Sequence, residues 1–264
     1  MRDKLRIFKR YGFFSLRVFL NSIFEFSQNF LSIKTIKYEN KKIKFFINSE
    51  ISAIRAELFG KKEKEIYDFI SKNLDSSDIL FDIGANVGVF SIYSSYIKNI
   101  KCVAFEPEYS NLYLLKKNII LNNLQNKIFV YPIALSNKNE LSILNLSSIK
   151  SGTAIHTVSK KEIDYTDENA KVVLRTGTYA CTLDDFINQT NILPTMLKID
   201  TDGKEFEILQ GGENALKKIK FIALEIPNNS DKEKEILDIL KDNNFIEQKD
   251  LRWKRNAFFK KNYD

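Results

Sequence analysis

The segment Ile79–Gly88, which reads Ile-Leu-Phe-Asp-Ile-Gly-Ala-Asn-Val-Gly, decides the fold of this chain. Its apolar start predicts a buried β-strand, its glycines predict a tight turn, and the apolar spacing of the next residues predicts a helix that begins at once. Such a turn lets a ligand approach the backbone at Gly84 and Gly88, and the N–H groups of the first helical turn attract an anionic group. A nucleotide-like cofactor is therefore the expected occupant.

The glycine spacing argues against a dinucleotide. The dinucleotide fingerprint is G-x-G-x-x-G, whereas here Asn86 stands between Gly84 and Gly88 and no third glycine follows. The next strand-like run, Lys101–Phe105, is followed by Glu106. A carboxylate at the end of that neighbouring strand can hold ribose hydroxyls. The pattern favours a Rossmann-type fold that binds a nucleoside and disfavours NAD.

Three motifs in order resemble the FkbM family of S-adenosylmethionine-dependent methyltransferases. They are Asp82–Gly88, Phe105–Pro107 and Leu197–Glu205, the last followed by Leu209 and Gly211. The likeness runs from Ser77 to Pro227 and more weakly to Tyr263, with a departure at Asp202, where the family more often has Glu. The resemblance implies an α/β fold of the Rossmann-like class I methyltransferase type. Its sheet is expected to be mostly parallel and seven-stranded, with helices on both faces and an antiparallel C-terminal edge strand.

From Ile79 onward, strand-like and helix-like segments alternate, which requires a mostly parallel sheet with right-handed crossovers. Strands are predicted over 79–82, 101–105, 128–131, 196–200, 221–226, 245–249 and 256–260, and helices over 89–97, 111–122, 205–216 and 232–243. Residues 140–175 break this rhythm with short alternating runs at 141–146 and 172–174 around a polar loop. An insertion of this length is often functional, so we expect it to face the substrate.

Two parts are predicted, an arm over 1–76 and a methyltransferase domain over 77–264. Within the arm, residues 34–47 suggest a small hairpin around Asn40 and Lys41, and residues 51–74 have helical periodicity broken at Gly60. Residues 1–33 combine bases with aromatic residues. Two interpretations remain open: peripheral contact with a membrane, or packing on the domain or on a second subunit in a homodimer. Interruptions of the apolar face, such as Asn21 and Glu25, favour packing.

Composition sets the remaining bounds. The 264 residues suit one large domain with an arm, and 44% hydrophobic with 28% charged residues is typical of a folded globule. The net charge is +7, and most of the basic residues are lysines. We interpret this excess of lysine as a solvated basic surface. Cys102 and Cys181 form no disulfide or zinc pattern, and we see neither a membrane-spanning run nor a signal peptide. We therefore expect a cytoplasmic protein, with the inner face of the membrane as the alternative location.

The resemblance also implies roles for the cofactor residues. S-adenosylmethionine is the expected cofactor, bound by Asp82, Gly84, Asn86, Gly88 and Glu106. Among these, Glu106 is expected to hold the ribose diol and Asp82 to orient the methionine amine. Adenine is expected near residues 131–136.

Candidates for catalysis lie further along the chain. Asp200 is the main candidate for a general base or acceptor-orienting acid, since it ends a strand at the ligand-binding edge. Glu205 is a second candidate, although it could instead form a structural ion pair with Lys198. His156, the single histidine, is the third because imidazole titrates in the right range. We expect no metal site, because the next strand offers only Glu225 as a further ligand.

The sequence therefore predicts an S-adenosylmethionine-dependent O-methyltransferase that acts on a hydroxyl of a sugar or glycan precursor, an acceptor class that the resemblance supplies. Three rivals remain open: an NAD-dependent reductase, a nucleic-acid methyltransferase, and a non-enzymatic membrane-associated binding module. A nucleic-acid methyltransferase would be expected to have an Asn/Asp-Pro-Pro-aromatic motif after the fourth strand. Here Asp200 is followed by Thr201 and Asp202, so this motif is absent. We accordingly expect a small-molecule or glycan partner and no nucleic acid.

Overall fold

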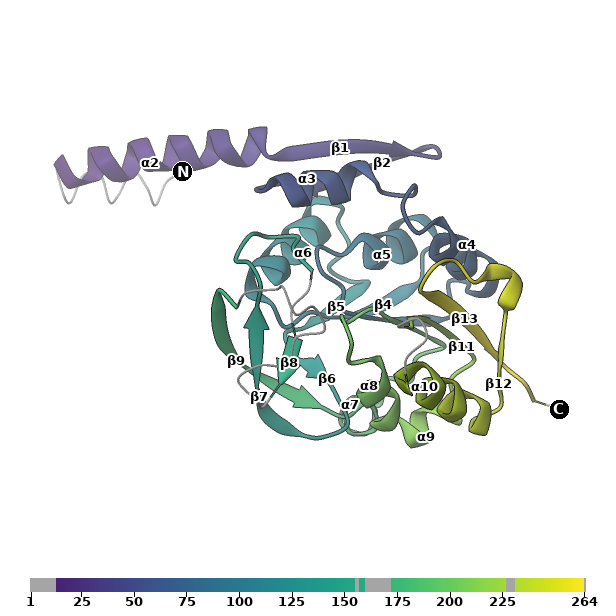
Figure 1. Cartoon of the computed structure of the whole chain (residues 1–264). Helices are drawn as coiled ribbons and strands as arrows, with labels where there is room; N and C mark the ends of the chain where they lie inside the picture. The colour runs from purple at the N-terminus through teal and green to yellow at the C-terminus, as the bar shows by residue number, and fades with distance from the viewer. Residues whose placement is uncertain (1–12, 155–156, 160–171, 227–230, 264) are drawn as a thin grey trace.

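A seven-stranded sheet forms the centre of the molecule, with helices on both of its faces (Figure 1). The computed structural model describes residues 13–154, 157–159, 172–226 and 231–263. The strands follow the order β12-β13-β11-β10-β3-β4-β5 across the sheet. Their bounds are β3 Ile79–Ile83, β4 Lys101–Phe105, β5 Ile128–Tyr131, β10 Met196–Ile199, β11 Phe221–Glu225, β12 Phe245–Glu247 and β13 Asn256–Lys261.

The five strands from β11 to β5 are all parallel, which confirms the mostly parallel sheet. Near the C-terminus, β13 is antiparallel to both β11 and β12. The edge position belongs to β12. The edge strand is thus antiparallel to its neighbour, which confirms the antiparallel strand expected at the C-terminal edge of the sheet. The order of strands depends on pairing between distant segments, which the residue pattern of a single strand does not encode.

Successive residues of the central strands point to opposite faces and fill two separate cores. Leu80 of β3 packs in the core beneath α4 (Lys64–Asn73) and α6 (Tyr109–Leu121). Its neighbour Phe81 packs in the opposite core, beneath α8 (Glu205–Gln210) and α10 (Asp231–Asp242). A strand covered on both faces needs apolar residues at nearly every position, which explains the continuous apolar runs in the sequence.

Two predicted helices are each divided in the structure. The helix expected over 89–97 consists of α5 (Val89–Ile92) and one π-helical turn, Tyr93–Ile97. The helix expected over 205–216 consists of α8 and α9 (Glu213–Leu216), separated by two glycines. A Cβ at Gly211 would lie 2.1 Å from the backbone oxygen of Ser136. Glycine therefore allows these two segments to touch at the point where the helix is interrupted.

The chain before β3 contributes a projecting helix and a layer that packs on the sheet (Figure 1). Its elements are α2 Phe13–Leu31, β1 Ile33–Tyr38, β2 Lys41–Phe46, α3 Glu50–Glu57 and α4. Ile43 and Phe45 of β2 share a buried core with Leu80 of β3, so this layer continues the core of the sheet. The domain boundary at residue 76 stays a prediction. Within the described residues, no helix combines the length and apolarity needed to cross a membrane.

The insertion after β5 forms a second, four-stranded sheet of order β6-β9-β7-β8 beside the main one. Its strands are β6 Ala134–Leu135, β7 Glu140–Leu146, β8 Thr157–Ser159 and β9 Leu174–Cys181. The alternating run predicted over 141–146 is part of β7, whereas β9 extends well beyond the short run expected near residue 174. This second sheet then leads into α7 (Leu183–Thr190) and back to β10.

Candidate active site

The turn after β3 is shaped by two glycines with left-handed backbone. Gly84 follows β3 with a φ of +77°, and Gly88 precedes α5 with a φ of +85°. A Cβ at Gly84 would lie 2.0 Å from the backbone oxygen of Asp200, and one at Gly88 would lie 2.3 Å from Cδ1 of Leu115. The backbone contact and the positive φ together require glycine at position 84, whereas at position 88 the positive φ favours it and the side chain of Leu115 could move. Gly84 lines the cavity described below, whereas Gly88 does not.

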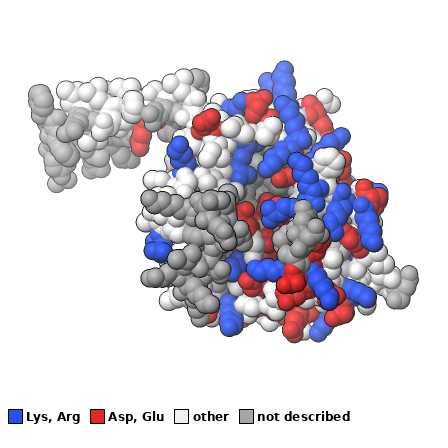
Figure 2. All heavy atoms as spheres, in the orientation of Figure 1, with Lys and Arg blue, Asp and Glu red and all other residues white. Residues whose placement is uncertain are grey.

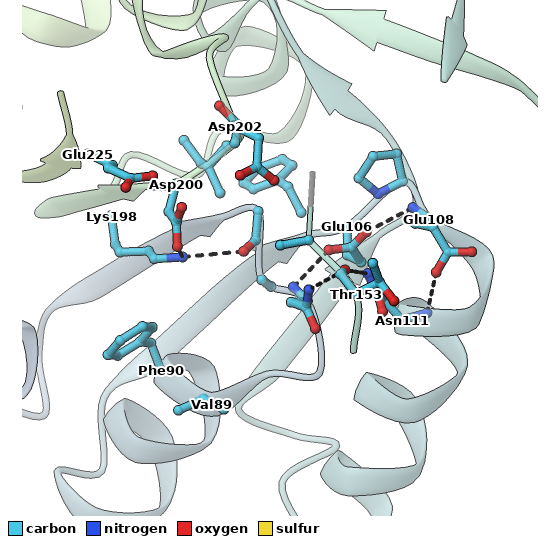
Figure 3. A pocket seen from close by; sticks show the side chains of 18 of the residues that line it. Val89, Phe90, Glu106, Glu108, Asn111, Thr153, Lys198, Asp200, Asp202 and Glu225 are labelled. Atoms are coloured by element: carbon cyan, nitrogen blue, oxygen red, sulfur yellow. Dashed lines mark hydrogen bonds and ion pairs between the residues drawn. The ribbon is translucent and has the colours of Figure 1, made fainter. Parts of the chain in front are cut away.

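Glu106, at the end of β4, fixes the same turn with its carboxylate. Oε2 accepts the N–H of Asn86 at 2.7 Å, and Oε1 accepts the N–H of Glu108 at 2.8 Å (Figure 3). Burial raises the pKa of Glu106 to about 7, although these two hydrogen bonds oppose the shift. Each oxygen keeps a second lone pair, so Glu106 can accept further hydrogen bonds from a ligand in the cavity that it lines.

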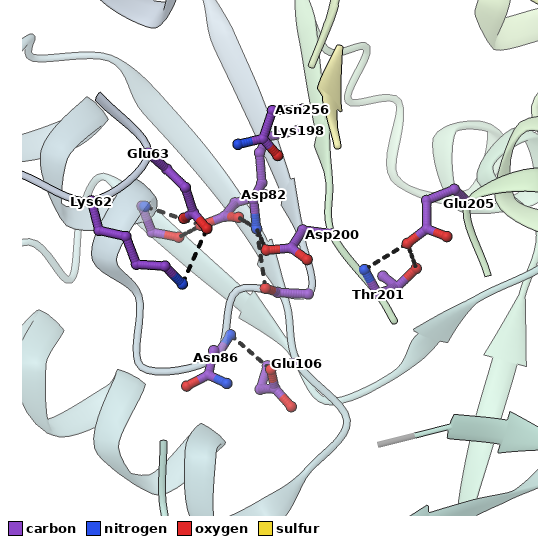
Figure 4. A network of polar contacts seen from close by, with 12 residues as sticks. Lys62, Glu63, Asp82, Asn86, Glu106, Lys198, Asp200, Thr201, Glu205 and Asn256 are labelled. Atoms are coloured by element: carbon purple, nitrogen blue, oxygen red, sulfur yellow. Dashed lines mark hydrogen bonds and ion pairs between the residues drawn. The ribbon is translucent and has the colours of Figure 1, made fainter. Parts of the chain in front are cut away.

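Lys198 of β10 forms a buried ion pair beside the cavity (Figure 4). Its Nζ lies 3.2 Å from Oδ1 of Asp82 and 3.6 Å from Oδ2 of Asp200, and it donates to the backbone oxygen of Gly84. Burial alone lowers the pKa of a lysine, but the nearby carboxylates, led by Asp82, outweigh it and raise the pKa of Lys198. Oδ2 of Asp82 accepts both the N–H and the hydroxyl of Ser91. Asp82 is consequently fully buried and does not line the cavity.

Three carboxylates line the cavity at the ends of β10 and β11: Asp200, Asp202 and Glu225 (Figure 3). Oε1 of Glu225 lies 3.2 Å from Nε of Arg255. Burial, and next the charge of Asp200, raise the pKa of Glu225 to about 7, while Arg255 opposes them. Glu225 can therefore exchange a proton near neutral pH. Among the described residues, no three Asp, Glu, Cys or His side chains are arranged as a metal site.

Glu205 holds the loop after β10 and does not line the cavity. Its Oε1 accepts the N–H of Thr201 at 2.9 Å and the Thr201 hydroxyl at 3.0 Å (Figure 4). The side chain is buried, and this burial raises the pKa of Glu205. Glu205 was a candidate either for catalysis or for a structural ion pair with Lys198, and in the structure it contacts the loop that carries Asp200 and Asp202. The sequence motif did not distinguish these two roles.

These groups surround a cavity of about 460 Å³ at the carboxyl ends of β3, β4, β10 and β11, a size typical of small-molecule sites. Figure 3 shows two polar ends. Glu106, Glu108 and Asn111 lie at one end, Asp200 and Glu225 lie near Lys198 at the other, and Asp202 lies between the two ends. Apolar walls come from the segment after β5 and from α3 with the residue that follows it: Ile133, Ala134, Leu135, Ile51, Ile54 and Leu58.

A turn of the inserted sheet, residues 151–153, closes one side of the cavity. The side chain of Asn111 on α6 accepts the N–H of Gly152 at 2.7 Å and donates to the backbone oxygen of Thr153 at 3.2 Å. Asn86 donates to that same oxygen at 3.0 Å, and Arg55 of α3 donates to the oxygen of Gly152. The turn therefore joins three elements around the cavity. Thr153 itself lines the cavity, and that the insertion faces the substrate stays a prediction.

The structure brings together only part of the predicted site. The predicted residues that line the cavity are Gly84, Asn86, Glu106 and Asp200, and those that lie nearby without lining it are Asp82, Gly88 and Glu205. His156 lies outside the described residues. Sequence reasoning missed Arg55 and Asn111, and it considered Glu225 only as a metal ligand. The sequence did contain a signal for Glu225. It is an acidic residue at the end of a predicted parallel strand, and if that strand is next to the one that leads to Asp200, the two carboxylates must lie close together.

Comparison with known proteins gives one family and several distant relatives. The family model described as Methyltransferase FkbM domain matches residues 82–247. A hexuronic acid methyltransferase of Haloferax volcanii is 24% identical over 166 residues, which cover 62% of this chain and 62% of that protein, less than two thirds of its length.

Two crystal structures are also similar. An FkbM methyltransferase from Methylobacillus flagellatus has 15% identity and a TM-score of 0.46, covering 81% of this chain and 56% of that one. A Streptococcus pneumoniae protein described as a tRNA (m1A22) methyltransferase, in complex with S-adenosyl-L-methionine, has 14% identity and a TM-score of 0.45. That match covers 75% of this chain and 72% of the other.

Proposed function

The chain belongs to the FkbM methyltransferase family, and from this premise we propose that it transfers a methyl group from S-adenosylmethionine to a hydroxyl oxygen of a sugar or glycan precursor. The methyltransferase class follows from the family. The cofactor, the oxygen acceptor and the sugar are our proposal. One observation carries it: a single cavity has a buried carboxylate suited to a ribose at one end and a proton-accepting carboxylate pair at the other.

The cofactor end of the cavity fits a nucleoside. Glu106 lines the cavity with its remaining lone pairs, which can accept the two ribose hydroxyls. The backbone at Gly84 and Ala85 lines the adjacent wall, where a side chain at position 84 would collide with Asp200. Ala134 and its neighbours supply an apolar surface against which a flat base can pack. We do not assign Asp82 to the methionine amine, since its carboxylate is already bound by Lys198 and Ser91 inside the protein.

The acceptor end of the cavity fits removal of a hydroxyl proton. S-adenosylmethionine, when bound, supplies a methyl group that is attacked by the acceptor oxygen. The protein must hold that oxygen in line and take its proton as the new carbon–oxygen bond forms. We assign orientation of the hydroxyl to Asp200, which Lys198 holds in place, and acceptance of the proton to Glu225. A base that titrates near the working pH is best matched to this task.

Support for a sugar acceptor comes from two sources. The acceptor end is lined by charged side chains, including Lys62, Lys204 and Asp200, which suit a molecule rich in hydroxyl groups. The Haloferax volcanii relative is named as a methyltransferase of hexuronic acid. Together these observations favour a carbohydrate over an apolar acceptor.

The proposal is tested by incubating the full chain with methyl-labelled S-adenosylmethionine and a panel containing methyl glucuronide, methyl glucoside and a transfer RNA. We expect label in a sugar, in a form that resists mild alkali, because a methyl ether survives treatment that cleaves a methyl ester. Label lost in alkali would indicate methylation of a carboxyl group and contradict a hydroxyl acceptor. Label in RNA alone would contradict the sugar.

A further inference from the structure

The projecting helix α2 carries an exposed apolar stripe that is interrupted by Ser27. Leu16, Leu20, Ile23, Phe24 and Leu31 are between 42% and 79% exposed. At about 100° per residue, these five positions fall within an arc of about 100° on one side of the helix. No described residue of α2 belongs to the buried cores of the protein, and Figure 1 shows the helix extending away from the body. The stripe is therefore a surface that the described parts of this chain do not cover.

The opposite side of α2 carries polar residues beside Val18. Asn21 and Glu25 are exposed and lie outside the apolar arc. In the space-filling view the described atoms of the projecting segment are almost all uncharged, in contrast with the blue and red surface of the body (Figure 2). A helix with one apolar and one polar side is suited to lie along an interface between water and lipid, because its apolar side alone enters the acyl chains.

The hairpin that follows α2 adds a group of like charges. Ile43 and Phe45 of β2 point into the core, so Lys42 and Lys44 point to the outer face of the hairpin. Lys37 of β1 is directly opposite Lys42 and is also exposed. Like charges directly opposite each other in a sheet are destabilising. Among the described residues, none of these three lysines has an ion-pair partner.

An anionic surface would relieve this repulsion. The lysine face and the apolar stripe are continuous in the chain, since β1 begins two residues after α2 ends. Membrane binding by an interfacial helix becomes stronger with the apolar area it buries and with electrostatic attraction to anionic lipids, and both features are present here. Nucleic acid would satisfy the lysines but would leave the apolar stripe in water. A second copy of the chain could cover the stripe but would bring further lysines to the hairpin.

We propose that α2 and the outer face of the β1–β2 hairpin form a peripheral binding surface for a bilayer that contains anionic lipids. The apolar stripe enters the headgroup boundary, and Lys37, Lys42 and Lys44 contact the headgroups. This surface does not depend on the reaction that the cavity catalyses.

The test is flotation of the full chain with vesicles made of equal parts phosphatidylglycerol and phosphatidylcholine, compared with phosphatidylcholine alone. The chain is expected to float with the anionic vesicles and much less with the neutral ones. I23Q/F24Q should weaken binding roughly a hundredfold, because two large apolar groups no longer enter the lipid. K37Q/K42Q should weaken it at least roughly tenfold, since each lysine near an anionic surface contributes about 1 kcal/mol.

Matched controls separate this surface from general effects of charge and helix substitution. N21Q/S22Q places the same two residues outside the stripe of α2, and K217Q/K218Q removes the same charge from exposed lysines at α9, on the opposite side of the body. Both should float as the unaltered chain does.

The proposal is overturned if the unaltered chain stays unbound, or if test and control variants float equally. A dimer in light scattering that I23Q/F24Q dissociates, without flotation, would assign the stripe to a second copy instead. Retention of RNA that is sensitive to K37Q/K42Q, without flotation, would overturn it in favour of nucleic acid.

Discussion

The ammonium of Lys198 lies 3.2 Å from the carboxylate of Asp82, in a contact between two adjacent strands that is almost completely excluded from solvent. This ion pair joins the first and third sequence motifs. The same ammonium lies 3.6 Å from Asp200, which is partly exposed at the cavity. One buried cation thus connects the core of the fold to the carboxylate assigned to the acceptor.

Replacing Lys198 alone should be strongly destabilising. K198M leaves the Asp82 charge buried without its partner, and loss of one member of a buried pair typically costs about 3–5 kcal/mol. Substituting Asp82→Asn in the same chain removes the stranded charge, so most of that loss should be recovered in the double variant. Urea unfolding at neutral pH measures both values. Equal stabilities of the single and double variants would show that the pair is not coupled.

Gly84 should be the least replaceable glycine in the site. G84A places a methyl group 2.0 Å from a backbone oxygen at a φ of +77°, so we expect a loss of at least about 2 kcal/mol or failure to fold. Gly177 in β9 is the matched control, because no atom lies within 4 Å of its added Cβ. Thermal unfolding of the two variants should differ clearly. Similar melting temperatures would contradict the close approach of β3 and β10.

Cofactor affinity should depend on pH through Glu106. Its raised pKa of about 7 means that the carboxyl group becomes protonated as the pH falls below neutrality, and the protonated form accepts ribose hydroxyls less well. Affinity for S-adenosylhomocysteine should therefore fall roughly tenfold from about pH 8 to about pH 6. E106Q, which does not titrate, should bind weakly at both values. Glu108 and Lys198 also influence this carboxyl group, so a flat profile in the unaltered chain would count against Glu106 as the ribose ligand.

The two carboxylates of the acceptor end should affect turnover differently. E225Q should lower kcat at least roughly a hundredfold and remove its rise toward neutral pH, because the proton acceptor is lost. D200N should lower kcat and move the midpoint of the remaining rise to lower pH, since the Asp200 charge helps to raise the pKa of Glu225. S-adenosylhomocysteine should bind both variants as it binds the unaltered chain. If the midpoint in D200N does not shift, the charge of Asp200 does not influence the titration of Glu225, and the prediction is wrong.

The sequence predicted the main sheet because its strands are buried on both faces. The boundaries of β4 and β5 agree with the predicted ranges, since the apolar run of β4 ends at Glu106 and that of β5 lies between Lys127 and Pro132. The order of β12 and β13 could not be predicted, because both are short and their pairing is between distant residues. The division of α8 from α9 depends on contact between Gly211 and Ser136, which no local pattern reveals.

The site was predicted less completely, for a related reason. A motif identifies residues that are close in sequence, but it does not show which of them a distant residue will cover. Leu115 packs against Gly88, and Lys198 takes the carboxylate of Asp82, so both motif residues serve the fold. The titration of Glu225 arises only when β10 and β11 place it near Asp200 in a partly buried position. That property exists only in the folded chain.

The central claim is that the cavity beside Gly84 and Glu106 holds the nucleoside part of S-adenosylmethionine. Calorimetric titration of the full chain at about pH 8 with S-adenosylhomocysteine, and separately with NADH, tests it most directly. We predict one site for S-adenosylhomocysteine, loss of at least roughly tenfold in affinity in E106Q, an unchanged affinity in the exposed control E213Q, and no heat with NADH. Binding of NADH instead, or S-adenosylhomocysteine binding that E106Q leaves intact, would contradict the account.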